Sequence, residues 1–320
     1  MFMPSETEFV PNGTDSGSGL SVHFIDVGQA DATLILCDGK SMLIDGGNKG
    51  DSDLIYTYLE KNGIEYLDYV VGTHAHEDHM GGLPGAFHFA DVGNVLCPVT
   101  DDDTKFFSDF KKSVEAKGLE IVVPSPKDTF SLGNANIEVL ACNCGKDTNN
   151  TSIALKLEYG EVSFLFMGDA EAEVEEYIIE NGFDINTTVL KAGHHGSSSS
   201  TSNYFLHLAD PDFAVISCGK GNSYGHPHDE TVEKLREFDV TMYRTDILGD
   251  IICTSDGKTV SFVTSKGESQ KNFVLNTHNK KFHLPECDGA KTISDKNRKE
   301  YKGTLRSLCE NGYIPCGRCG

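Results

Sequence analysis

A run of six residues, 74–79, constrains this chain more than any other part of the sequence. It reads His-Ala-His-Glu-Asp-His, behind a hydrophobic run at 69–71 and ahead of several glycines. This order is typical of a buried strand that ends in a loop of metal ligands at a sheet edge. A polar surface loop with chance histidines is the alternative, and the tight spacing argues against it.

The spacing within this run allows for two metal ions. Because side chains alternate in an extended segment, His74 and His76 point the same way and can reach one ion. The chain then turns, so that Asp78 and His79 can reach a second ion. Imidazole and carboxylate ligands together suit zinc, manganese or iron.

The run resembles the His-x-His-x-Asp-His signature of the metallo-β-lactamase superfamily. Other segments resemble one branch of that superfamily, the hydrolase domain of the DNA-uptake channel protein ComEC and its stand-alone relatives. Together they span roughly residues 20–265, and only Ala30 departs from the glycine that is usual there. These segments are residues 24–31, 43–47, 149–152, 166–169, 191–197 and 224–227.

The resemblance implies a fold of the α/β class, an αββα sandwich of the metallo-β-lactamase type. It also implies two divalent metals, zinc or manganese, with Asp169 bridging them. Asp45 would orient a metal-binding histidine, with a simple turn aspartate as the alternative. The first metal would be bound by His74 and His76, and the second by Asp78, His79 and His195.

The first metal site is the incomplete part of this ligand set. Many relatives use a further histidine there, whereas this chain has Asn149 and Asn150. We expect Asn150 to lie, like Asp45, in the layer around the ligands. His226 or a water molecule is the candidate for the missing ligand.

The implied chemistry is hydrolysis by a water that two metals activate, whose pKa falls to about 7. Asp78 would act through the metals, and His194 and His226 would donate to the leaving group or hold a phosphate oxygen. The branch resemblance implies a phosphodiesterase or nuclease that acts on DNA. The alternatives are hydrolysis of a small phosphodiester, a lactam or a thioester, and an inactive scaffold whose tail binds a partner. The complete ligand motifs argue against the scaffold.

Charge divides the chain unevenly. The whole chain carries a net charge of −22, which argues against non-specific nucleic-acid binding, yet residues 271–320 hold ten Lys or Arg against five Asp or Glu. This contrast predicts three parts: a disordered leader or linker at 1–19, a hydrolase domain at 20–268, and a small module at 275–320.

The sequence leaves the cellular location open. It contains no apolar run of the roughly 20 residues that a membrane helix requires. The first residues show no signal pattern, so the chain is expected in the cell envelope or outside the cell only if a signal or anchor was removed, and otherwise in the cytoplasm.

The tail contains two close ligand pairs, His283 with Cys287 and Cys316 with Cys319. Four such ligands predict one structural zinc, which a module of this size needs because its core is small. The tail resembles the metal-binding module of the Ada DNA-repair protein, in which four cysteines bind zinc; here a histidine replaces the first cysteine. A disulfide from Cys316 to Cys319 or Cys287 is the alternative. The excess of basic over acidic residues in the tail allows for a DNA contact. A purely structural role for the tail is the equally open alternative.

Apolar periodicity predicts helices over 51–62, 104–117 and 171–180, and a further helix from about residue 229. In the helix over 171–180 the glutamates are interpreted as a solvated face. A serine run at 197–200 is either a flexible loop or a group that holds a phosphate.

Overall fold

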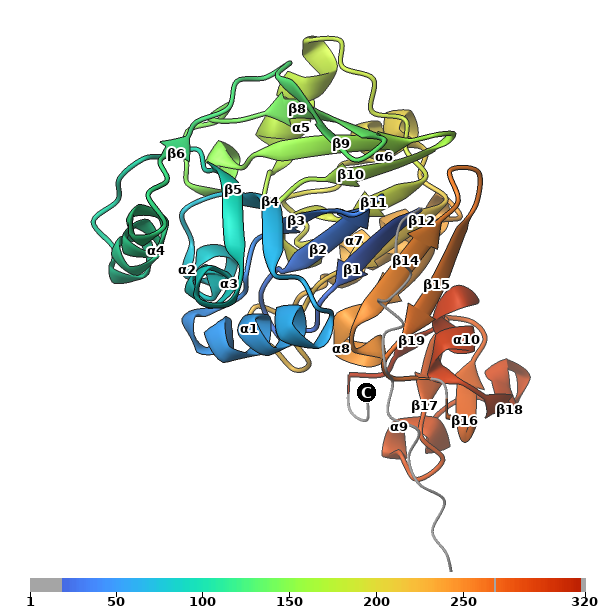
Figure 1. The fold of residues 1–320 in the computed structure, drawn as a ribbon. Helices are drawn as coiled ribbons and strands as arrows, with labels where there is room; N and C mark the ends of the chain where they lie inside the picture. Colours follow the sequence, from blue (N-terminus) through green and yellow to red (C-terminus); the bar gives the residue numbers. More distant parts are fainter. Residues whose placement is uncertain (1–18, 268, 318–320) are drawn as a thin grey trace, which may run out of the picture.

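The computed structural model describes residues 19–267 and 269–317. The predicted leader, except for Gly19, and the predicted ligand Cys319 lie outside these ranges. Two β-sheets face each other, and helices cover their outer sides (Figure 1). This arrangement confirms the predicted αββα sandwich.

The first sheet has eight strands in the order β15-β14-β1-β2-β3-β4-β5-β6. The strands from β3 to β6 run parallel, and the remaining pairs are antiparallel. The strands are β1 (Leu20–Phe24), β2 (Thr33–Cys37), β3 (Lys40–Ile44), β4 (Tyr66–Val71), β5 (Asp91–Leu96), β6 (Ile121–Val122), β14 (Ile251–Ser255) and β15 (Val260–Thr264).

The second sheet has seven strands in the order β13-β12-β11-β10-β9-β8-β7. Its half from β10 to β13 is parallel, and its half from β7 to β10 is antiparallel. The strands are β7 (Thr129–Leu132), β8 (Ala135–Ala141), β9 (Ala154–Tyr159), β10 (Val162–Phe166), β11 (Val189–Lys191), β12 (Phe213–Ile216) and β13 (Thr241–Arg244).

Helices cover both sheets because strand residues alternate between two apolar faces. On β3, Met42 packs between the sheets, whereas Leu43 packs outward under the helices. On the first sheet lie α1 (Ser52–Lys61), α2 (Glu77–Met80), α3 (Leu83–Phe89) and α4 (Lys105–Ala116); on the second lie α5 (Ala172–Glu180), α6 (Asn203–Ala209) and α7 (Asp229–Glu237).

The four predicted helices are present, within one or two residues of the expected bounds. In α4, the side chains of Phe107, Phe110 and Val114 are buried, as the helical spacing of these apolar residues predicts. Short helical segments connect other elements: η1 (Lys49–Asp51), η2 (Asn149–Thr151), η3 (Gly193–Gly196) and α8 (Thr245–Leu248).

The tail forms a third sheet with its own small core, in the order β18-β16-β17-β19. It packs against the larger unit, because Cys309 lies in the core between the two large sheets and Ile314 in the core outside the second. Its elements are β16 (Lys271–Asn276), β17 (Lys281–His283), α9 (Asp288–Lys291), η4 (Asp295–Asn297), β18 (Arg298–Gly303), α10 (Leu305–Glu310) and β19 (Ile314–Pro315).

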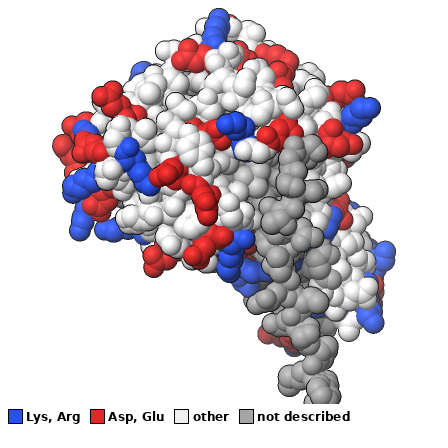
Figure 2. Space-filling view, in the orientation of Figure 1, with Lys and Arg blue, Asp and Glu red and all other residues white. Residues whose placement is uncertain are grey.

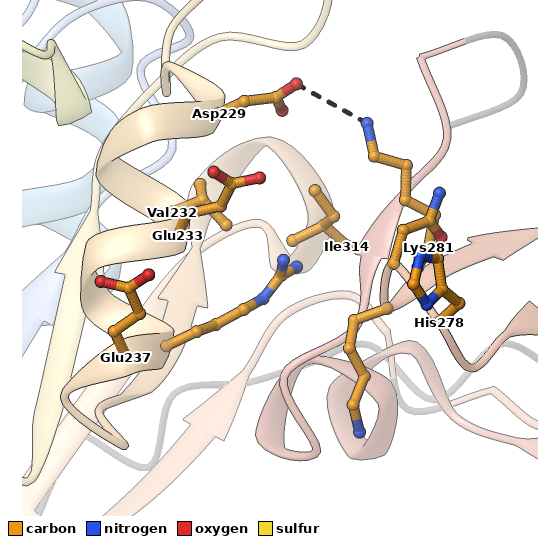
Figure 3. Close-up of a pocket in the computed structure, with 10 residues that line it drawn as sticks. Asp229, Val232, Glu233, Glu237, His278, Lys281 and Ile314 are labelled. Atoms are coloured by element: carbon orange, nitrogen blue, oxygen red, sulfur yellow. Dashed lines mark hydrogen bonds and ion pairs between the residues drawn. The ribbon is translucent and has the colours of Figure 1, made fainter.

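A cavity of about 380 Å³ separates the tail from α7. Figure 3 shows Asp229, Glu233 and Glu237 on the side of α7, facing His278 and Lys281 of the tail. An ion pair of 3.7 Å between Lys281 Nζ and Asp229 Oδ2 spans the cavity.

On the face that Figure 2 shows, acidic and basic side chains are interspersed over the surface. None of the helices within residues 19–267 and 269–317 is long and apolar enough to cross a membrane.

Candidate metal centre

The candidate ligands lie just beyond the carboxyl ends of four strands. β3 and β4 run parallel in the first sheet, so Asp45 and the run 74–79 emerge at the same edge. β10 and β11 run parallel in the second sheet and bring out Asp169 and the pair His194 and His195. The two facing sheets therefore bring ligands from distant parts of the chain together.

The local backbone conformation directs these side chains toward one another. His194 and His195 both have left-handed backbone angles, with φ of 49° and 54°. Non-glycine residues seldom adopt these angles, and such outliers gather at functional sites. After the run 74–79, a Cβ at Gly82 would collide with the carbonyl oxygen of Gly46, so only glycine lets these two loops touch.

The ligand atoms form two groups that share one carboxylate. The first ligand group is His74, His76 and Asp169, and the second ligand group is Asp78, His79, Asp169 and His195. Within each group, all ligand atoms lie within 4.8 Å of one another. The structure thus brings together all six residues that the sequence predicts as metal ligands.

Individual distances show how closely these atoms converge. His79 Nε2 lies 3.2 Å from Asp169 Oδ1, and His195 Nε2 lies 3.2 Å from Asp78 Oδ2. In the first ligand group, His74 Nε2 lies 3.0 Å from His76 Nδ1 and 3.8 Å from Asp169 Oδ2.

The donors fit a divalent cation. His79 Nε2 and Asp169 Oδ1 are buried, and within the described part of the chain neither has a hydrogen bond. Leaving such atoms unpaired costs about 1–3 kcal/mol each. Because His79 Nδ1 donates to Asp45 at 2.8 Å, the lone pair of Nε2 points toward Asp169. Two facing lone pairs require a cation or a proton between them.

Asp45 orients His79 and is itself firmly positioned. Besides the His79 bond, its carboxylate accepts hydrogen bonds of 2.8 Å from both the backbone N–H and the hydroxyl of Thr73. Thr73 directly precedes the ligand run. This is the geometry expected of a carboxylate that fixes the tautomer of a metal-binding histidine.

The corresponding support of His195 was missed in the sequence. His195 Nδ1 donates to the Ser217 carbonyl at 3.1 Å and lies 3.3 Å from Asp31 Oδ1. Asp31 is in turn paired with Lys191 at 2.7 Å, and both side chains are almost fully buried. The only available signal was that both residues lie in segments that resemble the family.

His194 has a similar arrangement. Its Nδ1 lies 3.2 Å from Glu171 Oε1 and forms a hydrogen bond of 3.2 Å with Ser199 Oγ, and its Nε2 lies 3.7 Å from Asp169 Oδ2. Glu171 is held by Asn150, whose Oδ1 accepts from the Glu171 backbone N–H at 3.0 Å. The interpretation of Glu171 as part of a solvated helix face was wrong, because Glu171 lies at the N-cap position before α5 and its Oε1 is 3.2 Å from His194 Nδ1.

His226 lies outside both ligand groups, although it was a candidate to complete the first one. Gln29 explains its orientation: Gln29 Oε1 accepts from the Gly219 backbone N–H at 3.0 Å, so its Nε2 must face His226 Nδ1, 3.3 Å away. His226 Nδ1 therefore accepts, and the proton lies on Nε2. Burial, together with the charges of His195 and His194, lowers the pKa of His226 to about 4, so the ring is neutral at pH 7.

Members of both ligand groups, together with His194 and His226, line one pocket of about 310 Å³. Asn149, rather than Asn150, faces it, and the buried Asn149 Oδ1 has no hydrogen bond within residues 19–267 and 269–317. The lining residues are Gln29, His76, Glu77, Asp78, Asn149, Asp169, His194, His195, Tyr224 and His226.

The serine run beside the pocket bonds mainly within the protein. The Ser198 backbone N–H donates to His228 Nδ1 at 2.9 Å, and the Ser200 hydroxyl donates to the Ala170 carbonyl at 2.8 Å. These two groups are thus not oriented toward a phosphate. His228, to which the sequence gave no role, supports this turn.

The tail contains a separate ligand cluster of His283, Cys287 and Cys316, all buried. Cys287 Sγ lies 3.7 Å from His283 Nδ1 and 3.6 Å from Cys316 Sγ. A disulfide needs about 2.05 Å between sulfurs, so Cys287 and Cys316 are not bonded to each other. The fourth predicted ligand, Cys319, lies outside the described residues.

Residues 25–220 match the family model described as Metallo-beta-lactamase superfamily. The chain belongs to this superfamily. It is therefore a superfamily hydrolase, as the ligand run predicted. Its fold is similar to that of the metallo-beta-lactamase fold protein YhfI from Bacillus subtilis, with a TM-score of 0.51 and 15% identity over 74% of this chain and 100% of that chain.

The resemblance to the ComEC-like branch is also confirmed. The chain is 28% identical over 250 residues to ComE operon protein 3 of Bacillus subtilis (strain 168), covering 72% of this chain and 32% of that protein. It is 26% identical over 230 residues to Competence protein ComA of Neisseria gonorrhoeae, covering 70% and 30%. The chain thus spans about a third of the length of these relatives.

Proposed function

We propose that this hydrolase cleaves phosphodiester bonds in DNA with two divalent metal ions, zinc or manganese. The observation that carries the proposal is Asp169, a carboxylate common to two ligand groups that border one pocket. A pair of metals suits in-line displacement at phosphorus, where the attacking and leaving oxygens both need stabilisation. Relatives named for competence favour DNA as the phosphodiester.

Charge in the pocket supports an anionic substrate once metals are present. Three carboxylates line it, those of Glu77, Asp78 and Asp169. Without metals they would repel a phosphate, whereas two divalent cations would more than neutralise them. Bound metals would supply an activated water and positive charge beside the phosphate.

Two histidines outside the six predicted ligands, His194 and His226, would act on the substrate. His226 is neutral and presents an N–H at Nε2, so it would donate a hydrogen bond to a phosphate oxygen. His194 Nδ1 lies 3.2 Å from both Glu171 Oε1 and Ser199 Oγ, and its Nε2 lies 3.7 Å from Asp169 Oδ2. His194 would donate to the leaving group or hold a phosphate oxygen, as the sequence suggested, or bind metal through Nε2.

The test compares substrate classes on the full chain loaded with Mn²⁺ or Zn²⁺. We expect cleavage of DNA and of a small chromogenic phosphodiester, and no cleavage of a lactam or a thioester. Asp169→Asn should lower cleavage at least ~100-fold, because it removes the charge that both ligand groups share. His207→Ala is the matched control, since His207 is an exposed histidine of α6 outside the pocket.

Two results would change the conclusion. Cleavage of the small phosphodiester without cleavage of DNA would support a small natural substrate. Lactam or thioester hydrolysis in the absence of any phosphodiesterase activity would refute the proposal.

For the tail, we propose a single structural zinc bound by His283, Cys287 and Cys316, with Cys319 as the fourth ligand. Three buried ligands support this, since Cys287 Sγ lies 3.7 Å from His283 Nδ1 and 3.6 Å from Cys316 Sγ. The apolar cluster around them contains Val274, Ala290 and Ile293, and even with the tail's other small core this is little apolar packing for a module of this size.

A further inference from the structure

Tyr224 is an exposed aromatic ring at the edge of the metal pocket. Its side chain is 68% exposed, the highest value among the exposed large hydrophobic residues of the described ranges. It is also the one residue of that set that lines the pocket. Exposing so large a ring forfeits the gain from burying it, so its position beside a charged centre needs an explanation.

The loop that carries Tyr224 is held by a dense set of hydrogen bonds. The Asn222 side chain accepts from the backbone N–H groups of Tyr224 and His226 at 3.1 and 3.0 Å. Its amide donates to the carbonyls of Gly219 and His226 at 2.9 and 2.6 Å. His228 Nε2 completes the loop by donating to the Tyr224 carbonyl at 3.2 Å. The loop therefore holds the ring in place before any ligand arrives.

The ring is also aligned with the pocket. Tyr224 and His226 lie nearly parallel, at 22° and 5.7 Å between ring centroids. His226 in turn lies 5.4 Å from the ring of His194. Because His226 lies along one face of the Tyr224 ring, a planar group would stack on the other face, at the edge of the pocket.

We infer that Tyr224 forms a stacking subsite for the nucleobase next to the scissile phosphate. The inference rests on the proposed phosphodiesterase function and specifies which part of the substrate the edge of the pocket recognises. Every nucleobase has a flat aromatic face, so such a platform binds single-stranded nucleic acid with little sequence preference. Such a contact would add affinity for DNA even in a protein with a net charge of −22, because base stacking does not depend on surface charge.

The inference predicts a base-dependent loss of affinity. Removing an aromatic platform costs about 1–3 kcal/mol per base, which corresponds to roughly a fivefold to 150-fold rise in the Michaelis constant. Tyr224→Ala should show this rise on a single-stranded oligodeoxynucleotide. Tyr224→Phe should not, because the stacking face is kept. The same oligonucleotide made with abasic sugars should respond to neither change.

The experiment uses the full-length, metal-loaded protein, these two substrates and Tyr204→Ala as the control. Tyr204 is a 63% exposed tyrosine that does not line the pocket, so its loss should leave both substrates unaffected. The affinities of both oligonucleotides are also measured by fluorescence anisotropy, which needs no cleavage.

The outcomes separate the two proposals. An equal loss on both oligonucleotides would show that Tyr224 only supports the loop, and no loss on either would show that no base stacks there; each result overturns the inference. If the wild-type protein cleaves DNA and Tyr224→Ala has no base-dependent effect, the stacking subsite fails and the nuclease stands. If the wild-type protein neither binds nor cleaves DNA, both fail.

Discussion

The buried pair of Asp31 and Lys191 offers a strong test of how the site is built. Lys191 Nζ lies 2.7 Å from Asp31 Oδ2, and within residues 19–267 and 269–317 its one other hydrogen bond goes to the Ala192 carbonyl at 3.2 Å. The two side chains are 3% and 6% exposed. Asp31→Ala leaves the ammonium buried without its counter-charge, which costs about 3–5 kcal/mol. That cost is a large share of the free energy of unfolding of a typical protein, which is about 5–15 kcal/mol.

The pH of the measurement follows from the pKa of Asp31. Burial opposes ionisation, but the charges of Lys191 and His195 outweigh it and keep the pKa of Asp31 well below its usual range. A carboxyl group whose pKa is lowered by folding contributes its full stabilisation at pH values above its unfolded-state pKa of about 3.9. This stabilisation is lost as the pH falls through the lower pKa of the folded state. At pH 7 the pair therefore contributes in full.

Urea unfolding of the metal-free chain at pH 7 measures the loss as a lower midpoint at constant slope. Asp91→Asn is the control, since its ion pair with Lys117 is mainly exposed and should change stability by less than about 1 kcal/mol. Combining Asp31→Asn with Lys191→Met removes both charges and should recover much of the loss. If Asp31→Ala costs no more than Asp91→Asn, the buried pair does not stabilise the fold and our reasoning is wrong.

Three further predictions follow from the metal groups. Asn149→His should tighten zinc binding by the first ligand group, because Asn149 faces the pocket with an unpaired oxygen; a chelator competition that shows no change would contradict this. Metal binding to the metal-free protein at pH 7 should release protons, because two of the candidate ligands are protonated histidines there. Burial disfavours the charged imidazoles, but the carboxylates of Asp169 and Asp45 raise the pKa of His79 well above its usual value. In the same way, Asp169 and Asp31 raise the pKa of His195 to about 10. Calorimetry in two buffers of different ionisation enthalpy checks this, and identical heats would refute it. Cys316→Ser should remove about one equivalent of zinc by elemental analysis while Cys144→Ser removes none; unchanged zinc in both would exclude the tail site.

The sequence could predict that these six candidate ligands lie together because most of them follow strand ends in short, recognisable runs. The spacing of the residues within 74–79 was enough to assign His74 and His76 to one ligand group and Asp78 and His79 to the other. Amphipathic periodicity likewise located α4, since three of its apolar residues at helical spacing are buried. Both signals are local, so they need no knowledge of how distant strands pair.

The supporting residues could not be predicted in the same way. Asp31 and Lys191 are 160 residues apart, and their contact depends on which strands face each other across the two sheets. Glu171 was misinterpreted because it adjoins an acidic helix, and the φ of 49° at His194 that brings the imidazole to it has no sequence signature. The role of His226 required the orientation of the Gln29 amide, which only the Gly219 contact reveals.

The tail illustrates a different limit. Its charge contrast and its cysteine pairs identified a unit with its own ligands, but neither signal says how that unit docks. In the structure, Cys309 and Ile314 complete the apolar cores of the two large sheets. Removing the tail would therefore expose core residues of the hydrolase, and point variants are the better test of any DNA contact.

The same packing connects the tail ligands to the pocket. β17 is only three residues long and carries both His283 of the tail cluster and Lys281, which pairs with Asp229 (Figure 3). Asp229 begins α7 directly after His228, the residue that bonds to the carbonyl of Tyr224. The exposed ion pair alone contributes little, about 0–1 kcal/mol, but it joins the strand that carries His283 to the helix that anchors the Tyr224 loop. A tail metal would thus support the edge of the pocket as well as its own module, without supplying any group to the chemistry.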